Sequence, residues 1–158
     1  MTLFDTHAHY DDEAFDADRD AVLAAFDGLV IDPGCTLASS QTAVDLAARH
    51  PHVYAAVGIH PENCGDFVPE HMDALRQLAR EPKVVAIGEI GLDYYWPENP
   101  PRDFQQQVFR AQLELALELD LPVIVHDREA HGDSLAIVKE YPALRGVFHC
   151  FSGSVEMA

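Results

Sequence analysis

Short apolar runs recur along the chain, and each is followed by a polar stretch with apolar residues at helical spacing. The runs cover residues 3–9 (LFDTHAH), 29–32 (LVID), 53–59 (VYAAVGI), 83–90 (KVVAIGEI), 121–126 (LPVIVH) and 146–151 (GVFHCF). Runs that are apolar on both faces are typical of parallel strands buried on both sides. The pattern therefore predicts six strands in a parallel sheet.

The stretches between these runs predict helices. The longest apolar stripe goes from Phe104 to Leu119, with Asp103 as its expected N-cap and Pro122 as its limit. Shorter stripes at 15–26, 44–48, 75–79 and 135–138 fill the other gaps. The alternation indicates one α/β domain over residues 1–158, either an open doubly wound sheet or a barrel. No GxGxxG or P-loop pattern follows a strand, so a nucleotide-binding open sheet is less favoured.

Charge narrows the class of ligand. The chain has 27 acidic and 10 basic residues, a formal net charge of −17, and no basic run. Such a surface is poorly suited to binding duplex DNA along a basic face. A polyanionic substrate would therefore be held locally, by bound metal or by a few arginines.

The sequence gives no sign of a membrane or secreted location. No apolar run approaches the ~18 residues of a membrane span, and the N-terminus lacks the pattern of a signal peptide. The cysteines Cys35, Cys64 and Cys150 have no CxxC spacing, which indicates reduced thiols. We expect a cytoplasmic protein with no membrane partner and no obligate protein partner, and we expect Cys150 to face the core.

Polar side chains interrupt the apolar runs at or near the carboxyl ends of the predicted strands. They are His7, His9, His60, Glu89, His126 and His149. Carboxyl ends of strands are where β/α folds gather catalytic residues, and a buried carboxylate such as Glu89 is costly unless it is paired or binds a cation. An extended 3–9 segment would also place His7 and His9 on one face. Any one histidine could simply be hydrogen-bonded, but together they predict a divalent-cation site.

The same residues carry a family resemblance. FDTHAHYDD, VGIHP, AIGEIGLDYY, FQQQVFRAQLELALELDLPVIVHDREA and VFHCFSGSVEMA resemble, in order and spacing, the TatD-like metal-dependent deoxyribonucleases of the amidohydrolase superfamily. GEIGLDYY followed by PVIVHDREA and HCFSG is far more specific than HxH alone. The resemblance implies a (β/α)8 TIM barrel, with about six of the eight β/α units in this chain. It also implies a hydrolase of phosphodiester bonds at DNA ends, acting on single strands or strand ends through two divalent metal ions (Mg²⁺, Mn²⁺ or Zn²⁺).

The resemblance further implies roles for individual residues. The metal ligands would be His7 and His9 for one ion, His126 and His149 for the other, and Glu89 as the bridge.

Substrate-binding roles follow in the same way. Arg128 would contact phosphate, and His60 and Asp93 would lie close to the substrate. Arg128 is two residues after His126 on the same predicted strand, so its side chain would lie on the same face as that of His126. The alternative for Arg128 is a surface ion pair with Glu129 or Asp133. We expect Asp93 to lie in a loop.

The chain departs from the family in two ways. Glu62 and Asn63 follow GIHP, where many members have another histidine or acidic pattern. The family's catalytic aspartate and its last two strands would lie beyond Ala158, so we expect a C-terminally truncated member. Six strands would leave two open sheet edges, through which self-association is possible.

Two other functions remain open. One is a superfamily hydrolase acting on an amide or lactone, which would call for a carboxylated lysine where Glu89 stands, and Lys83 is too early in the chain. The other is an inactive metal-binding remnant that lacks the catalytic aspartate.

Overall fold

Six parallel strands form one sheet, and their spatial order is their order along the chain. They are β1 (Leu3–Asp5), β2 (Gly28–Pro33), β3 (Val53–Val57), β4 (Val84–Asp93), β5 (Val123–Arg128) and β6 (Gly146–Phe148). The computed structural model describes residues 3–157, so residues 1, 2 and 158 of the predicted domain lie outside it. An unbroken 1-to-6 order is that of a barrel, because a doubly wound sheet reverses its order part-way. The prediction of six parallel strands is confirmed, and the barrel arrangement holds.

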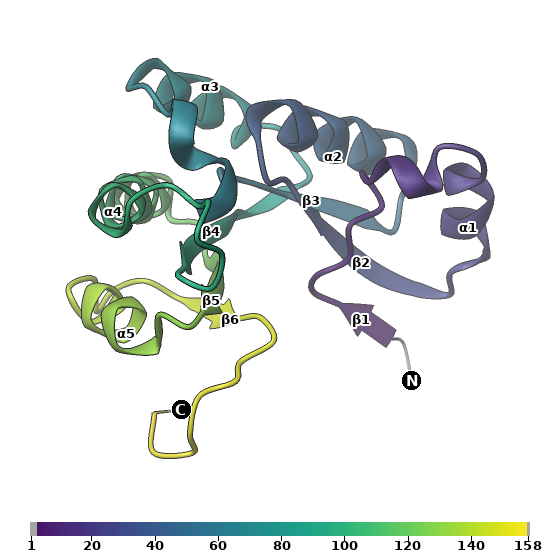
Figure 1. Cartoon of the computed structure of the whole chain (residues 1–158). Helices are drawn as coiled ribbons and strands as arrows, with labels where there is room; N and C mark the ends of the chain where they lie inside the picture. Colours follow the sequence, from purple (N-terminus) through teal and green to yellow (C-terminus); the bar gives the residue numbers. More distant parts are fainter. Residues whose placement is uncertain (1–2, 158) are drawn as a thin grey trace.

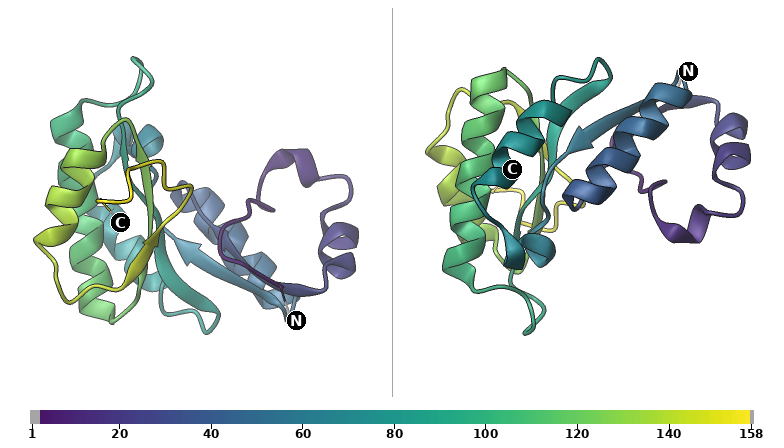
Figure 2. Two further views of the ribbon diagram at one scale, coloured as in Figure 1. Left: turned by 90° about the horizontal axis from the view of Figure 1, so that it is seen from below. Right: turned by 90° about the horizontal axis from the view of Figure 1, so that it is seen from above.

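The helices cover the outer side of the curled sheet (Figure 1). They are α1 (Arg19–Ala25), α2 (Leu37–Arg49), α3 (Glu70–Leu78), α4 (Arg102–Leu119) and α5 (His131–Lys139), with short 3-10 helices η1 (Glu13–Phe15) and η2 (Pro61–Asp66). Figure 2 shows α1 at one end of the curled sheet and α4 and α5 at the other. No helix within residues 3–157 combines the length and hydrophobicity that a membrane crossing requires.

The central strands β2 to β5 are largely buried on both faces, and their alternate side chains belong to two different core clusters. Val30, Val53 and Val57 belong to the large core cluster that also contains residues of the outer helices. Residues of the opposite parity, such as Ile31 and Ala56, form a second and smaller cluster with their neighbours on β4 and β5. The double burial explains why the strands read as continuous apolar runs in the sequence.

Two buried glutamines of α4 fix the ends of the central strands. The side-chain oxygen of Gln112 accepts from Ile59 N at 2.8 Å, and its amide donates to Ile59 O at 3.0 Å. Gln105 bonds the backbone of Asp93 in the same two-sided way, at 2.9 Å for each bond. These bonds satisfy backbone groups just where β3 and β4 leave the sheet, and they therefore hold the carboxyl-end loops in place.

Several local predictions were wrong. The helix predicted over 15–26 splits into η1 and α1, because the aspartates there favour turns and caps, as Asp12 does by accepting from Ala14 N. Helix α4 begins at Arg102, so Asp103 lies in its first turn and is not the N-cap. Asp93 is the last residue of β4, not a loop residue.

The outer strands are also shorter than predicted. Strand β1 ends at Asp5 and β6 ends at Phe148, so His7, His9 and His149 lie in the loops that follow. The prediction that Cys150 faces the core was wrong, because Cys150 is exposed and has a φ of 45°. Side chains alternate between the two faces only within a strand, and β6 ends before Cys150. Within residues 3–157, β1 and β6 each pair with one strand and form the sheet edges.

Candidate metal centre

Glu89 lies at the middle of a ring of imidazoles. Its side chain is nearly fully buried, at 4% exposure. One oxygen, Oε1, lies 2.9 Å from His126 Nδ1 and 3.0 Å from His149 Nε2. The other, Oε2, lies 3.2 Å from His7 Nε2 and 3.4 Å from His9 Nε2. Each carboxylate oxygen therefore faces a different pair of histidines.

The histidines of the ring also pack on one another. His7 and His149 stack with ring centroids 3.8 Å apart, although they come from the first and last strands' loops. The Nε2 atoms of His7 and His9 lie only 3.1 Å apart. Two imidazole nitrogens that converge with Glu89 on one point are a typical donor set for a transition metal. His7, His9 and Glu89 accordingly form one group with potential ligand atoms within 4.8 Å of one another.

His60 and Asp93 contact the second side of the ring. His60 Nε2 lies 3.7 Å from Glu89 Oε1, and His60, Glu89 and His126 form a second potential ligand group. Asp93 is fully buried behind His126 and accepts from His126 Nε2 at 3.0 Å. That bond leaves His126 Nδ1 facing the centre. A carboxylate in this position can orient an imidazole that binds a metal. The sequence instead predicted that Asp93 lies close to the substrate. Both roles stay predictions.

The charges in the centre are strongly coupled. Burial by itself would raise the pKa of Glu89, but hydrogen bonds from His126, His149, His7 and His9 outweigh it and hold the pKa well below its usual range. Hydrogen bonds to Asp11 and Glu89 raise the pKa of His9 to about 10. Burial, together with the neighbouring His126, lowers the pKa of His60 to about 4. A permanent carboxylate among several imidazoles is an environment that favours a cation.

A third group of potential ligands was not predicted. Asp11 Oδ1 lies 3.3 Å from His9 Nδ1, and His9, Asp11 and Asp32 have ligand atoms within 4.8 Å of one another. Asp32 is fully buried, and neither of its oxygens has a hydrogen-bond partner among the described residues. In the sequence, Asp32 ends the apolar run LVID, and Asp11 follows two residues after His9.

Two further side chains lie near the histidines. Asp5 is exposed, and its Oδ1 accepts from the backbone N of His7 at 3.0 Å. Cys35, which was not predicted as a site residue, has its Sγ 4.0 Å from Glu89 Oε2, and burial strongly raises its pKa, so its sulfur is a thiol there.

Arg128 ends β5 and lies over two aromatic rings. Its guanidinium carbon is 3.8 Å from the ring centroid of Tyr95 and 5.3 Å from that of Trp96. Within residues 3–157 it makes no ion pair, so the alternative pairing with Glu129 or Asp133 does not form. Its predicted contact with phosphate stays a prediction.

The order of these residues along the chain matches a known family. The family described as TatD related DNase matches residues 4–158 of this chain. The chain belongs to the TatD family. The predicted family is thereby confirmed.

Curated TatD relatives are similar over almost the whole chain. The uncharacterized metal-dependent hydrolase YabD of Bacillus subtilis is 39% identical over 162 residues, which cover 99% of this chain and 63% of YabD. The 3'-5' ssDNA/RNA exonuclease TatD of Salmonella typhimurium is 38% identical over 159 residues, 96% of this chain and 60% of that protein. The chain therefore spans about three fifths of the length of the curated relatives it matches.

Solved TatD structures have the same fold. The TatD homolog YjjV of Escherichia coli K12 superposes with a TM-score of 0.90 at 36% identity, covering 99% of this chain and 62% of YjjV. A TatD family hydrolase of Entamoeba histolytica gives a TM-score of 0.88 at 25% identity, with 99% and 60% covered. The predicted α/β TIM-barrel family fold is confirmed, with six of its strands in this chain.

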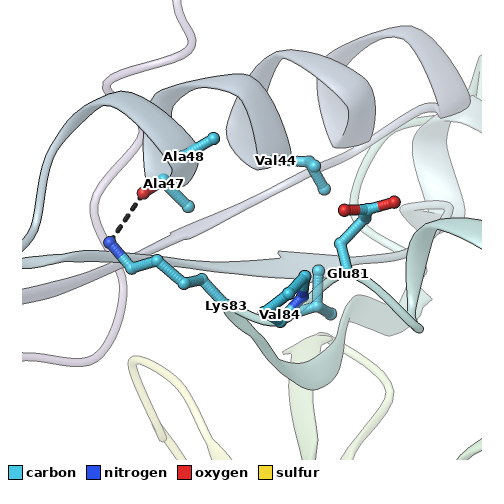
Figure 3. A pocket seen from close by; sticks show the side chains of 7 residues that line it. Val44, Ala47, Ala48, Glu81, Lys83 and Val84 are labelled. Carbon is cyan, nitrogen blue, oxygen red and sulfur yellow. Dashed lines mark hydrogen bonds between the residues drawn. The ribbon is translucent and has the colours of Figure 1, made fainter.

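The one candidate for a carboxylated lysine lies at the wrong end of its strand. Lys83 precedes β4, and its Nζ donates to the carbonyl oxygen of Ala47 at 2.6 Å, near the C-terminal end of α2 (Figure 3). It also donates to the carbonyl oxygen of His50 at 2.5 Å. A cation there offsets the negative end of the helix dipole. Glu89 is six residues further on, roughly 20 Å along an extended strand. Lys83 therefore cannot bridge metals in this TatD-family centre.

Proposed function

We propose that this chain carries the metal centre of a hydrolase that cleaves phosphodiester bonds at the ends of single-stranded nucleic acid. Two divalent cations would be held by His7 with His9 and by His126 with His149, and Glu89 would bridge them. The observation that supports this proposal is the division of the Glu89 carboxylate, whose Oε2 faces the first pair and whose Oε1 faces the second. The Salmonella typhimurium relative is named a 3'-5' ssDNA/RNA exonuclease, and this name supports DNA or RNA as the substrate class.

The donor set fits divalent cations. Imidazole nitrogens suit Zn²⁺ or Mn²⁺, and a bridging carboxylate suits Mn²⁺ or Mg²⁺ as well. Bound cations would supply the positive charge that activates a water and stabilises the leaving oxygen of a phosphodiester. Neutral imidazoles add no negative charge, so the centre stays attractive to phosphate inside a chain of net charge −17. Beyond ~8 Å the acidic surface is screened at physiological salt.

The residues around the ring would orient the reacting groups. Asp93 accepts from His126 Nε2 and so fixes which nitrogen of His126 faces the centre. His60, whose pKa burial lowers to about 4, is neutral at pH 7 and would lie beside the substrate as an uncharged hydrogen-bonding group. Arg128 has no carboxylate partner within residues 3–157 and would contact a phosphate of the strand.

Metal binding and hydrolysis can be tested separately. Chain stripped with EDTA is titrated with Mn²⁺ in a calorimeter, and we expect two ions per chain. Glu89→Gln should lose both, and His149→Ala should lose one. The matched control is Glu70→Gln, an exposed glutamate in the first turn of α3, which should bind like the unmodified chain. Equal Mn²⁺ binding by Glu89→Gln would refute the bridging role.

Hydrolysis is then followed on a gel with an end-labelled dT20 oligonucleotide and Mn²⁺. Loss of the cation charge removes several kcal/mol of transition-state stabilisation, so Glu89→Gln should lower the rate roughly 10³-fold or more. A chain that binds two ions without any turnover of dT20 would be the inactive metal-binding remnant instead.

A further inference from the structure

Two aromatic side chains are exposed beside the candidate metal centre. Tyr95 and Trp96, in the loop after β4, are 49% and 43% exposed, and their ring centroids lie 4.7 Å apart at 86°. Large aromatic rings in water are costly unless something covers them. Trp96 is the single tryptophan of the sequence. The structure gives this pair no packing role in the core, so its exposure calls for another reason.

The loop that carries the pair is held firmly to the centre. Tyr95 N donates to Asp93 Oδ1 at 2.9 Å, while Asp93 Oδ2 accepts from His126 Nε2 at 3.0 Å. Asn99 Nδ2 donates to Asp93 Oδ1 at 3.1 Å, and Tyr94 N donates to Arg128 O at 2.9 Å. A fixed aromatic surface loses little entropy when a ligand stacks on it. Two hydrogen bonds through one carboxylate thus connect this surface to a predicted metal ligand.

Two arginines next to this loop, Arg128 at the end of β5 and Arg102 at the start of α4, differ from most arginines of the chain. Arg128 lies over Tyr95, and Arg102 lies over Tyr94 with its guanidinium carbon 4.3 Å from the ring centroid. Neither arginine pairs with a carboxylate within residues 3–157. Five of the six other arginines do, namely Arg19, Arg49, Arg76, Arg110 and Arg145, and the exception is Arg80. Two uncompensated guanidinium groups beside exposed rings, in a protein of net charge −17, are complementary to a ligand that is both anionic and aromatic.

We propose that Trp96, braced by Tyr95 and Arg128, is a stacking site for a nucleobase of the single-stranded substrate. This inference rests on the proposed function, and it names the part of the substrate that the metal centre does not contact. Base–aromatic stacking is tolerant of sequence and does not depend on a basic groove, which this chain lacks. The site would also favour single strands, because bases in a duplex are already stacked on their neighbours.

The stacked base would lie close to the cleaved bond, because Arg128, which lies over Tyr95 and Trp96, is close to the candidate ligand His126 on β5. Arg128 follows His126 by two residues on β5, which is ~7 Å along the strand. That is about the rise of two nucleotides in a stacked chain, at 3.4 Å each. The base on Trp96 therefore belongs to a nucleotide within about two of the phosphodiester at the metal centre, and Arg128 contacts the phosphate between them.

The single tryptophan makes the test direct. The metal-free chain in EDTA is titrated with dT10 and with an abasic 10-mer that has the same phosphates but no bases, and Trp96 fluorescence is recorded. We expect dT10 to quench the fluorescence and to bind at least ten-fold more tightly than the abasic 10-mer. Equal affinity for the two strands, or no change of Trp96 fluorescence with dT10, would overturn the proposal.

Variants separate the base from the phosphate. By fluorescence anisotropy of end-labelled strands, Trp96→Leu should lower dT10 affinity roughly 5- to 150-fold, the range of one lost stack, and leave abasic binding unchanged. Arg128→Gln should weaken both strands by the same factor. Phe4→Leu, at an exposed aromatic outside this loop, is the matched control and should bind both strands as before.

No turnover is needed, so failure of this site and failure of the proposed function give different results. Undiminished dT10 binding by Trp96→Leu, with Mn²⁺-dependent hydrolysis intact, would refute the stacking site alone. Loss of hydrolysis in Glu89→Gln with Trp96-dependent dT10 binding retained would support it.

Discussion

Replacing Asp32 with asparagine should stabilise the metal-free chain, although the change removes a potential metal ligand at the candidate metal centre. Asp32 is 0% exposed, neither oxygen has a hydrogen-bond partner among the described residues, and Asp11 lies within 4.8 Å. Burial, and then the charge of Asp11, raises the pKa of Asp32 from 3.8 to about 8. An unpartnered carboxylate in this position prefers to be protonated.

The size and sign of the effect follow from proton linkage. Between pH 4 and pH 8 the folded chain keeps a proton on Asp32 that the unfolded chain has lost, so the free energy of unfolding falls as pH rises. Each pKa unit is 1.36 kcal/mol, which gives about 4 kcal/mol at pH 7 as an upper figure. Asparagine does not gain this whole amount, because its buried amide also loses its hydration. A hydrogen bond from the amide to Asp11 offsets part of that loss. We expect Asp32→Asn to gain about 2 kcal/mol or more at pH 8 and close to nothing at pH 4.

Urea unfolding in EDTA from pH 4 to pH 8.5 measures the effect. The gain of Asp32→Asn should grow with pH across this window and should level off near the folded pKa. For a chain of this length, 2 kcal/mol corresponds to roughly 4–8 °C in the unfolding midpoint temperature. Asp27→Asn is the matched control, because Asp27 is exposed just before β2 and makes no hydrogen bond or ion pair within residues 3–157. A destabilised Asp32→Asn chain, or a gain independent of pH, would refute the reasoning.

Four further outcomes test the fold and the centre. Asp93→Asn removes the acceptor that orients His126 and should lower Mn²⁺ affinity by about 10- to 100-fold in calorimetry, with the fold unchanged by circular dichroism. Gln112→Ala leaves Ile59 N and O buried without partners and should cost roughly 2–3 kcal/mol in urea unfolding; a cost near zero would mean that water replaces the amide. Thr36→Ala removes the capping box of α2 and should cost about 1 kcal/mol by the same measurement. Mn²⁺ at 100 times its dissociation constant should raise the unfolding free energy by about 2.7 kcal/mol per ion. A urea-unfolding midpoint that does not change when Mn²⁺ is added would contradict a metal centre.

Much of the architecture can be predicted from the sequence because burial leaves a one-dimensional pattern. Apolar runs such as LVID and VYAAVGI give strands buried on both faces, and the stripe from Phe104 to Leu119 gives α4 almost to the residue. Strand ends are harder to predict, since they depend on pairing with neighbours. Strand β1 pairs with β2 over only three positions, so the extended segment predicted to reach His9 stops at Asp5.

The candidate ligands were likewise visible as polar residues at strand ends, but their mutual arrangement was not. His7 and His9 do lie together as predicted, although they belong to the loop after β1 and not to an extended strand. Glu89 stood out as a carboxylate inside an apolar run. Nothing in local spacing reveals that Asp93 hydrogen-bonds His126, or that Arg128 lies over Tyr95. Those pairs are brought together by the register of β4 on β5, in which Asp93 is the partner of Arg128.

The sequence by itself thus determined where most strands and helices lie, and it marked several polar side chains near strand ends, among them Glu89 and His126. Periodicity and burial are properties of single segments, so one chain is enough to display them. Only the tertiary structure decided that the two oxygens of Glu89 face different histidine pairs, and that Asp32 is buried without a partner. Distances between segments far apart in the sequence depend on how the sheet curls and on which strands pair, and no local pattern records that.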